Sequence, residues 1–150
     1  MNINKITERS LEADVQTELQ QFESASRTML GLDSSVTEPD DVVRAIGQHI
    51  DGLEKAQSGP PTEKKILLLA CLWGIQICRR LSWEWVELTV DGEDYYGIVS
   101  PLREYAIFPF VYMRQLLTEE TRENTARLVY NMLKAGTYTP SEPHSYYVLE

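Results

Sequence analysis

Apolar residues in the first part of the chain recur at helical spacing. Between residues 7 and 30 they recur at spacings of three, four or seven at Leu11, Val15, Leu19, Phe22 and Met29, with Leu30 next to Met29. This spacing predicts one amphipathic helix over residues 7–30. Gly31 follows directly, where a glycine ends a helix in a left-handed cap.

A second helix is predicted after the linker LDSSVTEP. Thr37 or Asp40 can cap its first turn, and the breaker SGPP at 58–61 ends it. Its apolar face consists of Val42, Val43, Ile46, Ile50 and Leu53.

The most apolar segment of the chain, ILLLACLWGIQIC at residues 66–78, follows Pro61. A membrane-spanning helix needs about 20 apolar residues, so this segment is predicted to be a central core helix covered on several sides. Its two cysteines, Cys71 and Cys78, lie about 10 Å apart along a helix axis, beyond the reach of a disulfide bond. They are predicted to be reduced core residues.

The apolar period then shortens to two. WEWVELTV and YYGIV flank Asp91-Gly92, the strongest short hairpin signal. A two-residue turn pairs Val90 with Glu93, Leu88 with Tyr95, Val86 with Gly97, and Trp85 with Ile98. Alternation then sorts the side chains onto two faces. One face carries Val86, Leu88, Val90, Tyr95 and Val99, and the other carries Trp83, Trp85, Glu87, Thr89, Asp94, Tyr96 and Ile98.

The last third of the chain predicts one short strand and two more helices. The strand lies at about 105–108, and Pro109 suits the first turn of the helix that follows. A further helix is predicted to begin near Thr118 and to end at Gly136. Its expected inner face is Ala126, Leu128, Val129, Met132 and Leu133. The extended tail, residues 137–150, either docks on the sheet or swaps onto another molecule.

Together these elements predict a single α+β domain over residues 1–150. Its order is three N-terminal helices, a small antiparallel sheet with a hairpin at about 83–100, and two further helices.

The charge of the chain restricts its partners. Hydrophobic residues make up 43% and charged residues 25%, an ordinary globular composition, but 23 acids against 14 bases give a formal net charge of -9. Such a surface repels phosphate backbones and anionic lipid, so neither nucleic acid nor membrane is expected as a partner, and a basic protein is. The first residues, MNINKITERSLEADVQ, contain no apolar run typical of a signal peptide or anchor, which predicts a cytoplasmic protein.

Motifs for metal or cofactor chemistry are not found in the sequence. The two histidines, His49 and His144, have no second histidine within a helical turn, and no CxxC is present, so a zinc site is not expected. No GxSxG, Walker or GxGxxG motif occurs. We expect no cofactor, and His49 is predicted to be a partly exposed helix residue.

Carboxylates are the one catalytic ingredient in surplus. Glu84, Glu87, Asp91, Glu93 and Asp94 lie within eleven residues that contain no basic residue, a local charge of -5. A hydrolase or a weak calcium site can be built from such groups. A general acid, however, needs burial to raise its pKa, whereas acids at a hairpin tip are normally solvated. A solvated hairpin and a protein-binding edge remain the two main alternatives.

Four aromatic residues accompany these acids, namely Trp83, Trp85, Tyr95 and Tyr96. Tryptophan and tyrosine are favoured at interface centres, and surrounding carboxylates would select a cationic partner and speed its approach. The predicted partner-binding set is therefore these four aromatics and the five carboxylates. The alternative is that Trp83 and Trp85 pack beneath a helix.

The segments LACLWGIQICRRLSWEWVEL and YAIFPFVYMRQLL, with the acidic hairpin between them, resemble small bacterial proteins of a domain-of-unknown-function type, some of them immunity proteins that neutralise toxins. The resemblance covers roughly residues 65 to 117. It implies a compact cytoplasmic domain without a known cofactor, and it transfers no catalytic residue.

The predicted function is a non-enzymatic acidic interaction domain, most concretely an immunity-type inhibitor of a basic toxin. A secretion chaperone or scaffold, which would resemble an obligate dimer, and a carboxylate-dependent hydrolase are the alternatives. A homo-oligomer is left open.

Overall fold

A computed structural model of the chain describes residues 6–56, 61–119 and 123–149. Its helices and strands alternate in groups along the chain. They are β1 (Ile6–Ser10), α1 (Ala13–Leu30), α2 (Pro39–Ala56), α3 (Glu63–Leu81), β2 (Glu84–Val90), β3 (Glu93–Val99), β4 (Tyr105–Ile107), α4 (Pro109–Thr118), α5 (Ala126–Ala135) and β5 (Tyr147–Val148).

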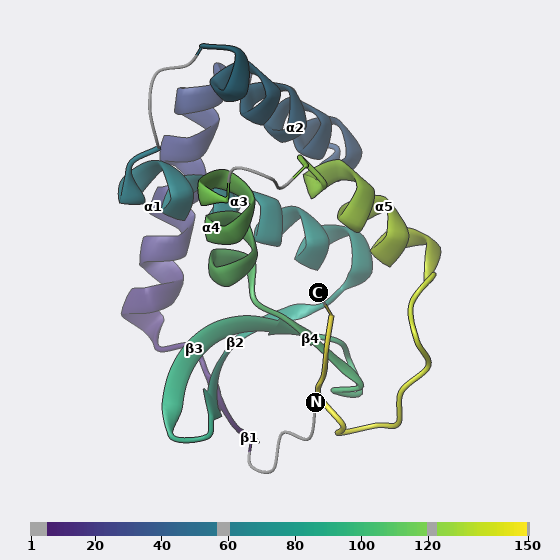
Figure 1. The fold of residues 1–150 in the computed structure, drawn as a ribbon. Coiled ribbons are helices and arrows are strands. Elements are labelled where there is room, and N and C mark those ends of the chain that lie inside the picture. The colour runs from purple at the N-terminus through teal and green to yellow at the C-terminus, as the bar shows by residue number, and fades with distance from the viewer. Residues whose placement is uncertain (1–5, 57–60, 120–122, 150) are drawn as a thin grey trace.

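Helix α3 forms the centre of the helical layer. Helices α1, α2, α4 and α5 all pack on it, and the curved sheet lies below them in the view of Figure 1. Every residue from Leu68 to Ile77 is buried, which confirms the predicted core helix. Among the described residues, no helix is both long and apolar enough to cross a membrane.

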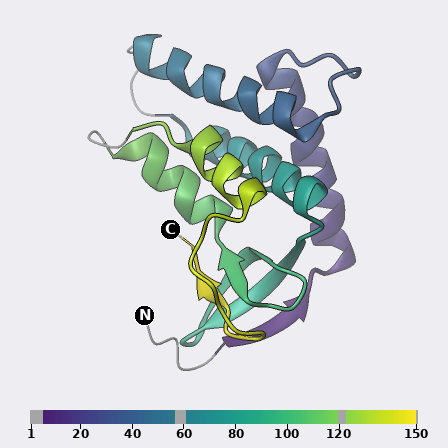
Figure 2. The same cartoon turned by 90° about the vertical axis from the view of Figure 1, so that its right-hand side faces the viewer.

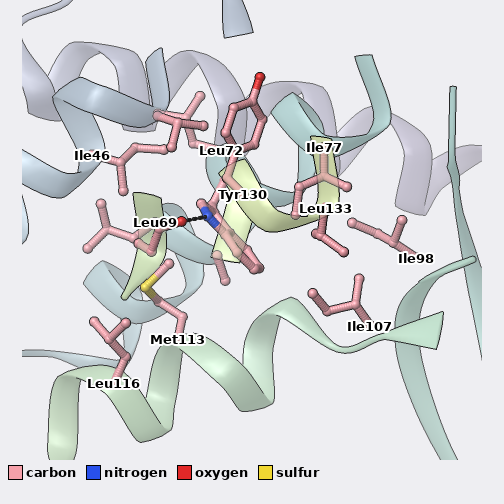
Figure 3. Close-up of a cluster of buried hydrophobic side chains, with 14 of the residues drawn as sticks. Ile46, Leu69, Leu72, Ile77, Ile98, Ile107, Met113, Leu116, Tyr130 and Leu133 are labelled. Atoms are coloured by element: carbon pink, nitrogen blue, oxygen red, sulfur yellow. Dashed lines mark hydrogen bonds between the residues drawn. The ribbon is translucent and has the colours of Figure 1, made fainter. Parts of the chain in front are cut away.

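The core joins all the helices around α3 to the sheet. Figure 3 shows buried side chains from α2, α3, α4 and α5 meeting Ile98 of β3 and Ile107 of β4. Trp73 of α3 stacks on Tyr112, and its indole N–H donates to the Ala126 carbonyl at 2.9 Å. Tyr130 of α5 is buried beside them. These contacts hold both C-terminal helices against α3.

The sheet has the order β1-β2-β3-β4-β5. The first three pairings are antiparallel, whereas β5 runs parallel to β4, so the predicted purely antiparallel sheet is corrected to a mixed one. All four predicted hairpin pairs are confirmed, from Val90 opposite Glu93 to Trp85 opposite Ile98. Asp91 and Gly92 both have positive φ, 50° and 85°, as a two-residue turn of this kind requires.

The predicted first helix is wrong over its first residues. Residues 6–10 form β1, an edge strand paired with β2, and α1 begins only at Ala13. Strand pairing satisfies the backbone of this segment and lets Ile6 pack against the apolar cluster on one face of the sheet. The helical spacing that starts at Leu11 does not extend back to Thr7, and Glu12 has an extended backbone.

Three predicted helix ends are confirmed. Gly31 and Gly136 end α1 and α5 with left-handed φ values of 67° and 71°, and Pro109 stands in the first turn of α4. Helix α2 ends at Ala56, and most of the predicted breaker, residues 58–60, lies outside the described residues.

The prediction for the last helix needs two corrections. Helix α5 begins at Ala126 and not near Thr118, which still belongs to α4. Leu128 and Met132, expected to face inward, are 57% and 43% exposed. Tyr130 occupies the inner face, because its hydroxyl donates to Asp40 of α2 at 2.5 Å.

The C-terminal tail docks on the chain's own sheet. Figure 2 shows it passing from α5 down to the sheet, where Tyr147 and Val148 pair with β4. Both cysteines are free, and burial raises the pKa of Cys71 and of Cys78 to about 12. Thiols with such pKa values are unreactive, in agreement with their predicted place in the core.

Candidate functional site

Three carboxylates of the hairpin strands contact arginines from elsewhere in the chain. Glu84 accepts a hydrogen bond from Nη2 of Arg103 at 2.6 Å, and Glu87 forms an ion pair with Arg9 of β1. Asp94 lies 3.3 Å from the same Arg9 guanidinium. The local charge of -5 in the sequence is therefore partly cancelled in the fold.

The predicted partner-binding residues do not share one surface. Glu87, Asp94, Tyr96 and Trp85 lie on the face of the hairpin that turns toward the helices, because β2 and β3 alternate in the predicted register. On the opposite face lie Glu84, Glu93 and Tyr95, and Asp91 occupies the turn. The Tyr95 hydroxyl donates to Glu93 at 2.7 Å.

The two tryptophans differ in their surroundings. Trp83 is only 8% exposed and stacks on Tyr105, with ring centroids 6.4 Å apart, so it is part of the core. Trp85 is half-buried, and its ring lies against Gly74 of α3 so closely that a Cβ there would be 2.3 Å from Cζ2. The Trp85 Nε1 atom is buried and has no hydrogen-bond partner in the described part of the chain.

An apolar groove lies beside α1, next to Trp85. It has a volume of about 230 Å3, and α1, α3, α4 and the hairpin all contribute to it. Its main apolar residues are Val15, Phe22, Leu67, Trp85, Tyr96 and Phe110. We call this space the α1 groove.

Helix α1 only partly covers the surface beneath it. Leu11, Val15, Leu19 and Phe22 are half-buried, although they form the apolar stripe of the helix. Ser26, nearer the C-terminal end, is buried and donates to the Leu68 carbonyl of α3. The helix is therefore anchored toward its C-terminal end and leaves the α1 groove along its first three turns.

A second, more polar hollow of about 460 Å3 lies on the other side of α1. Leu11, Leu19 and Trp85 border both hollows. The charges in the second hollow have partners, since Arg79 donates to Glu23 at 2.9 Å and Glu84 accepts from Arg103. It therefore offers less uncompensated charge to a partner than the α1 groove does.

One carboxylate, Glu18, lines the α1 groove, and Glu12 and Asp14 lie close enough to act on Tyr96 at its edge. Glu12, Asp14 and Glu18 are exposed, and no ion pair joins any of them to a cation within residues 6–56, 61–119 and 123–149. Tyr96 beside them is 41% exposed. Partial burial raises its pKa, and so do the negative charges of Glu87, Glu12, Glu18 and Asp14. The mouth of the groove is therefore electronegative.

On the other face of the sheet, Arg103 holds a compact ionic cluster. Its Nε and Nη2 atoms each donate to Glu8 at 2.9 Å, and the Tyr146 hydroxyl donates to Glu8 at 2.8 Å. The hydrogen bonds from Arg103 lower the pKa of Glu8. Burial and the hydrogen bond to Glu8 raise the pKa of Tyr146 to about 12. The cluster joins β1, the β3–β4 loop and the tail.

The described residues contain no group of three or more His, Cys, Asp or Glu side chains that could hold a metal ion. His49 is half-buried, as predicted for a partly exposed helix residue. Burial and nearby Lys65 lower its pKa, and its Nε2 atom has no partner among the residues the structure covers.

Sequence reasoning did not identify the acids of α1 as site residues. Asp14 and Glu18 are four positions apart and flank Val15, so the helical pattern already placed acids beside the apolar stripe. The sequence analysis considered only the acids of the hairpin as a partner-binding set and did not consider these acids. No family model, curated protein or solved structure matches this chain at a significant level.

Proposed function

We propose that the protein is a non-enzymatic, acidic interaction domain that binds a basic protein in the cytoplasm, most concretely an immunity-type inhibitor of a basic toxin. The observation that carries the proposal is the electronegative mouth of the α1 groove. There, Glu12, Asp14 and Glu18 have no cationic partner among the described residues and lie near half-exposed Tyr96.

Charge and aromatic surface both support this proposal. A cluster of unpaired carboxylates at low ionic strength speeds the approach of a cationic partner and disfavours phosphate-rich ones. Tyr96 and Trp85 then offer the stiff aromatic area that interface centres favour.

The surroundings of the hairpin carboxylates argue against the hydrolase alternative. Glu84 and Glu87 are bonded to arginines, and Asp94 accepts a hydrogen bond from the Thr89 hydroxyl at 2.6 Å. Each of these carboxylates already has a partner within the chain, whereas a catalytic carboxylate must be within hydrogen-bond reach of a substrate. This geometry makes the three groups poor candidates for catalysis.

A secretion chaperone is the second candidate, because the half-covered α1 groove could hold an apolar segment of a partner. Light scattering over a range of protein concentrations separates the two functions. A dimer that persists on dilution supports the chaperone, whereas a monomer supports the inhibitor.

The proposal is tested by affinity capture from the native cell lysate. The tagged wild type is compared with a variant carrying Glu12→Gln, Asp14→Asn and Glu18→Gln. We expect a basic protein that the wild type retains and the variant loses. Its association rate should fall by about tenfold or more as salt rises from low to above physiological concentration.

Two results would contradict the proposal. One is capture of the same proteins by both forms. The other is a tight complex whose association rate does not change with salt.

A further inference from the structure

The α1 groove has walls from two helices and a floor from a third. Helices α1 and α4 both pack on α3, and β3 contacts α4, with the helices above the sheet in the view of Figure 1. Phe110 of α4 lies 5.8 Å from Trp85, measured between ring centroids. The surface between α1 and α4 is thus apolar and bounded by helices, as in a site that accepts another helix.

Resting on the proposed function, we infer that the α1 groove binds a basic amphipathic helix of the partner protein. Its apolar face would contact Val15, Phe22 and Phe110, and its basic residues would face Glu12, Asp14 and Glu18.

The dimensions of the groove favour a helix. Its helical α1 side runs from Val15 to Phe22, about 10 Å along the helix axis at 1.5 Å per residue. This length corresponds to about two helical turns, the span that anchors at positions i, i+4 and i+7 occupy in helix-in-groove complexes. The volume of about 230 Å3 is below the range of about 300–1,000 Å3 typical of small-molecule sites.

Charge decides which helix fits. Glu18 lines the groove, and Glu12 and Asp14 also act on Tyr96 at its edge, whereas the nearby Glu87 is paired with Arg9. A lysine or arginine of the partner could contact these carboxylates and lie over the exposed face of the Tyr96 ring. A helix with an acidic polar face would place like charges together, which costs binding energy.

The partly exposed apolar residues of the α1 groove also favour a helix as its occupant. Val15, Phe22 and Phe110 are half-buried and Tyr96 is 41% exposed, so an added helix would cover apolar surface that the chain itself leaves open. The gain is about 25 cal/mol for each Å2 of apolar surface removed from water.

The inference is tested with three designed helical peptides. The first has leucines at helical spacing and lysines on its polar face, the second is a scrambled isomer, and the third carries glutamates in place of the lysines. Binding is measured by fluorescence anisotropy for the wild type, for Val15→Trp, which fills the groove, and for Leu128→Trp. Leu128→Trp is the matched control, because Leu128 is an exposed residue of α5 and lies outside the groove.

We expect the lysine-faced peptide to bind best and to lose about tenfold in affinity with Val15→Trp but not with Leu128→Trp. The indole N–H signal of Trp85 should shift in the NMR spectrum on binding. If Val15→Trp does not fold, Tyr96→Ala serves in its place, with the same expected loss.

The other outcomes separate the inference from the proposed function. The lysine-faced peptide and its scrambled isomer could bind equally well, with affinities that Val15→Trp does not change. That result overturns the inference that a helix binds in the α1 groove, but it leaves the proposal of a basic partner intact. Equal binding of the lysine-faced and glutamate-faced peptides in the groove overturns the basic partner. If no peptide binds, the helix-in-groove inference is overturned, and the lysate capture decides the proposed function.

Discussion

Two acidic regions of this molecule, the hairpin strands and the first turns of α1, differ in what the fold places beside them. Glu84 and Glu87 of the hairpin receive arginines from the β3–β4 loop and from β1. Glu12 and Glu18 of α1 receive no cation from any described residue. Arginines therefore compensate three of the five hairpin acids, whereas Asp91 and Glu93 at the turn, like the acids at the start of α1, have no ion pair with a described cation.

The comparison also concerns packing. Ile98 of the hairpin is buried in the core, whereas the apolar stripe of α1 is half-buried and lies along a groove of about 230 Å3. Trp85 connects the two regions, because it belongs to β2, packs on Gly74 of α3 and forms part of the groove. Disturbing Trp85 should therefore affect both regions, and disturbing a surface charge should affect only one.

The largest effect is expected for Gly74→Ala. The added Cβ would lie 2.3 Å from Cζ2 of Trp85 and 2.9 Å from Cδ1 of Ile98, so the indole must move. We expect a loss of about 2–3 kcal/mol in the free energy of unfolding, measured by urea denaturation. Gly52→Ala is the matched control. Apart from its chain neighbours and its own helix backbone, no described atom lies within 4 Å of its Cβ position, and the change should stabilise α2 by up to about 1 kcal/mol.

The next effect compares the two arginines that hold the hairpin carboxylates. The Arg103 side chain is 21% exposed and bonds to Glu8 and Glu84, whereas that of Arg9 is 57% exposed. Arg103→Ala should cost about 2–3 kcal/mol in the free energy of unfolding, because it leaves a partly buried Glu8 without its cation. Arg9→Ala should cost less than about 1 kcal/mol. Equal losses would show that burial does not distinguish the two pairs.

Acid should weaken the Arg103 cluster. Contact with Arg103 lowers the pKa of Glu8 below its ordinary value of 4.5. The stabilisation from this shift is therefore complete above that value and is lost as pH falls through the folded-state pKa. Urea denaturation at a series of pH values should show a smaller acid loss for Glu8→Gln than for the wild type. In an Arg103→Ala background, Glu8→Gln should change the acid loss of stability little further. If Glu8→Gln had its full effect there, the contact with Arg103 would not be the cause of the acid loss.

The smallest effect on stability is expected for the α1 variant with Glu12→Gln, Asp14→Asn and Glu18→Gln. These side chains are exposed and have no ion pair with a described cation, so the free energy of unfolding should change by less than about 1 kcal/mol. Thermal unfolding followed by circular dichroism checks this. A larger loss would mean that these acids stabilise the fold and are not free for a partner.

The features that depend on local sequence could be predicted. Asp91-Gly92 specifies a two-residue turn, and the turn sets the whole register of β2 and β3. Gly31, Gly136 and Pro109 likewise mark helix ends through their own backbone preferences.

The features that depend on distant contacts could not be predicted. β1 forms because β2 offers it an edge, and Arg9 meets Glu87 across 78 residues of chain. Tyr130 faces inward because Asp40, 90 residues earlier, accepts its hydroxyl. The half-buried apolar stripe of α1 also depends on distant parts of the chain. Its first turns lie over a groove because of how α3, α4 and the hairpin are arranged.

The most direct test of the docking face compares two variants that each lose three negative charges. One is the α1 variant with Glu12→Gln, Asp14→Asn and Glu18→Gln, and the other carries Asp91→Asn, Glu93→Gln and Asp94→Asn at the hairpin turn. The measurement is the affinity of the lysine-faced helical peptide at low salt. We predict a loss of about tenfold or more for the α1 variant and of less than about threefold for the hairpin variant. A hairpin variant that loses as much as the α1 variant would contradict the account.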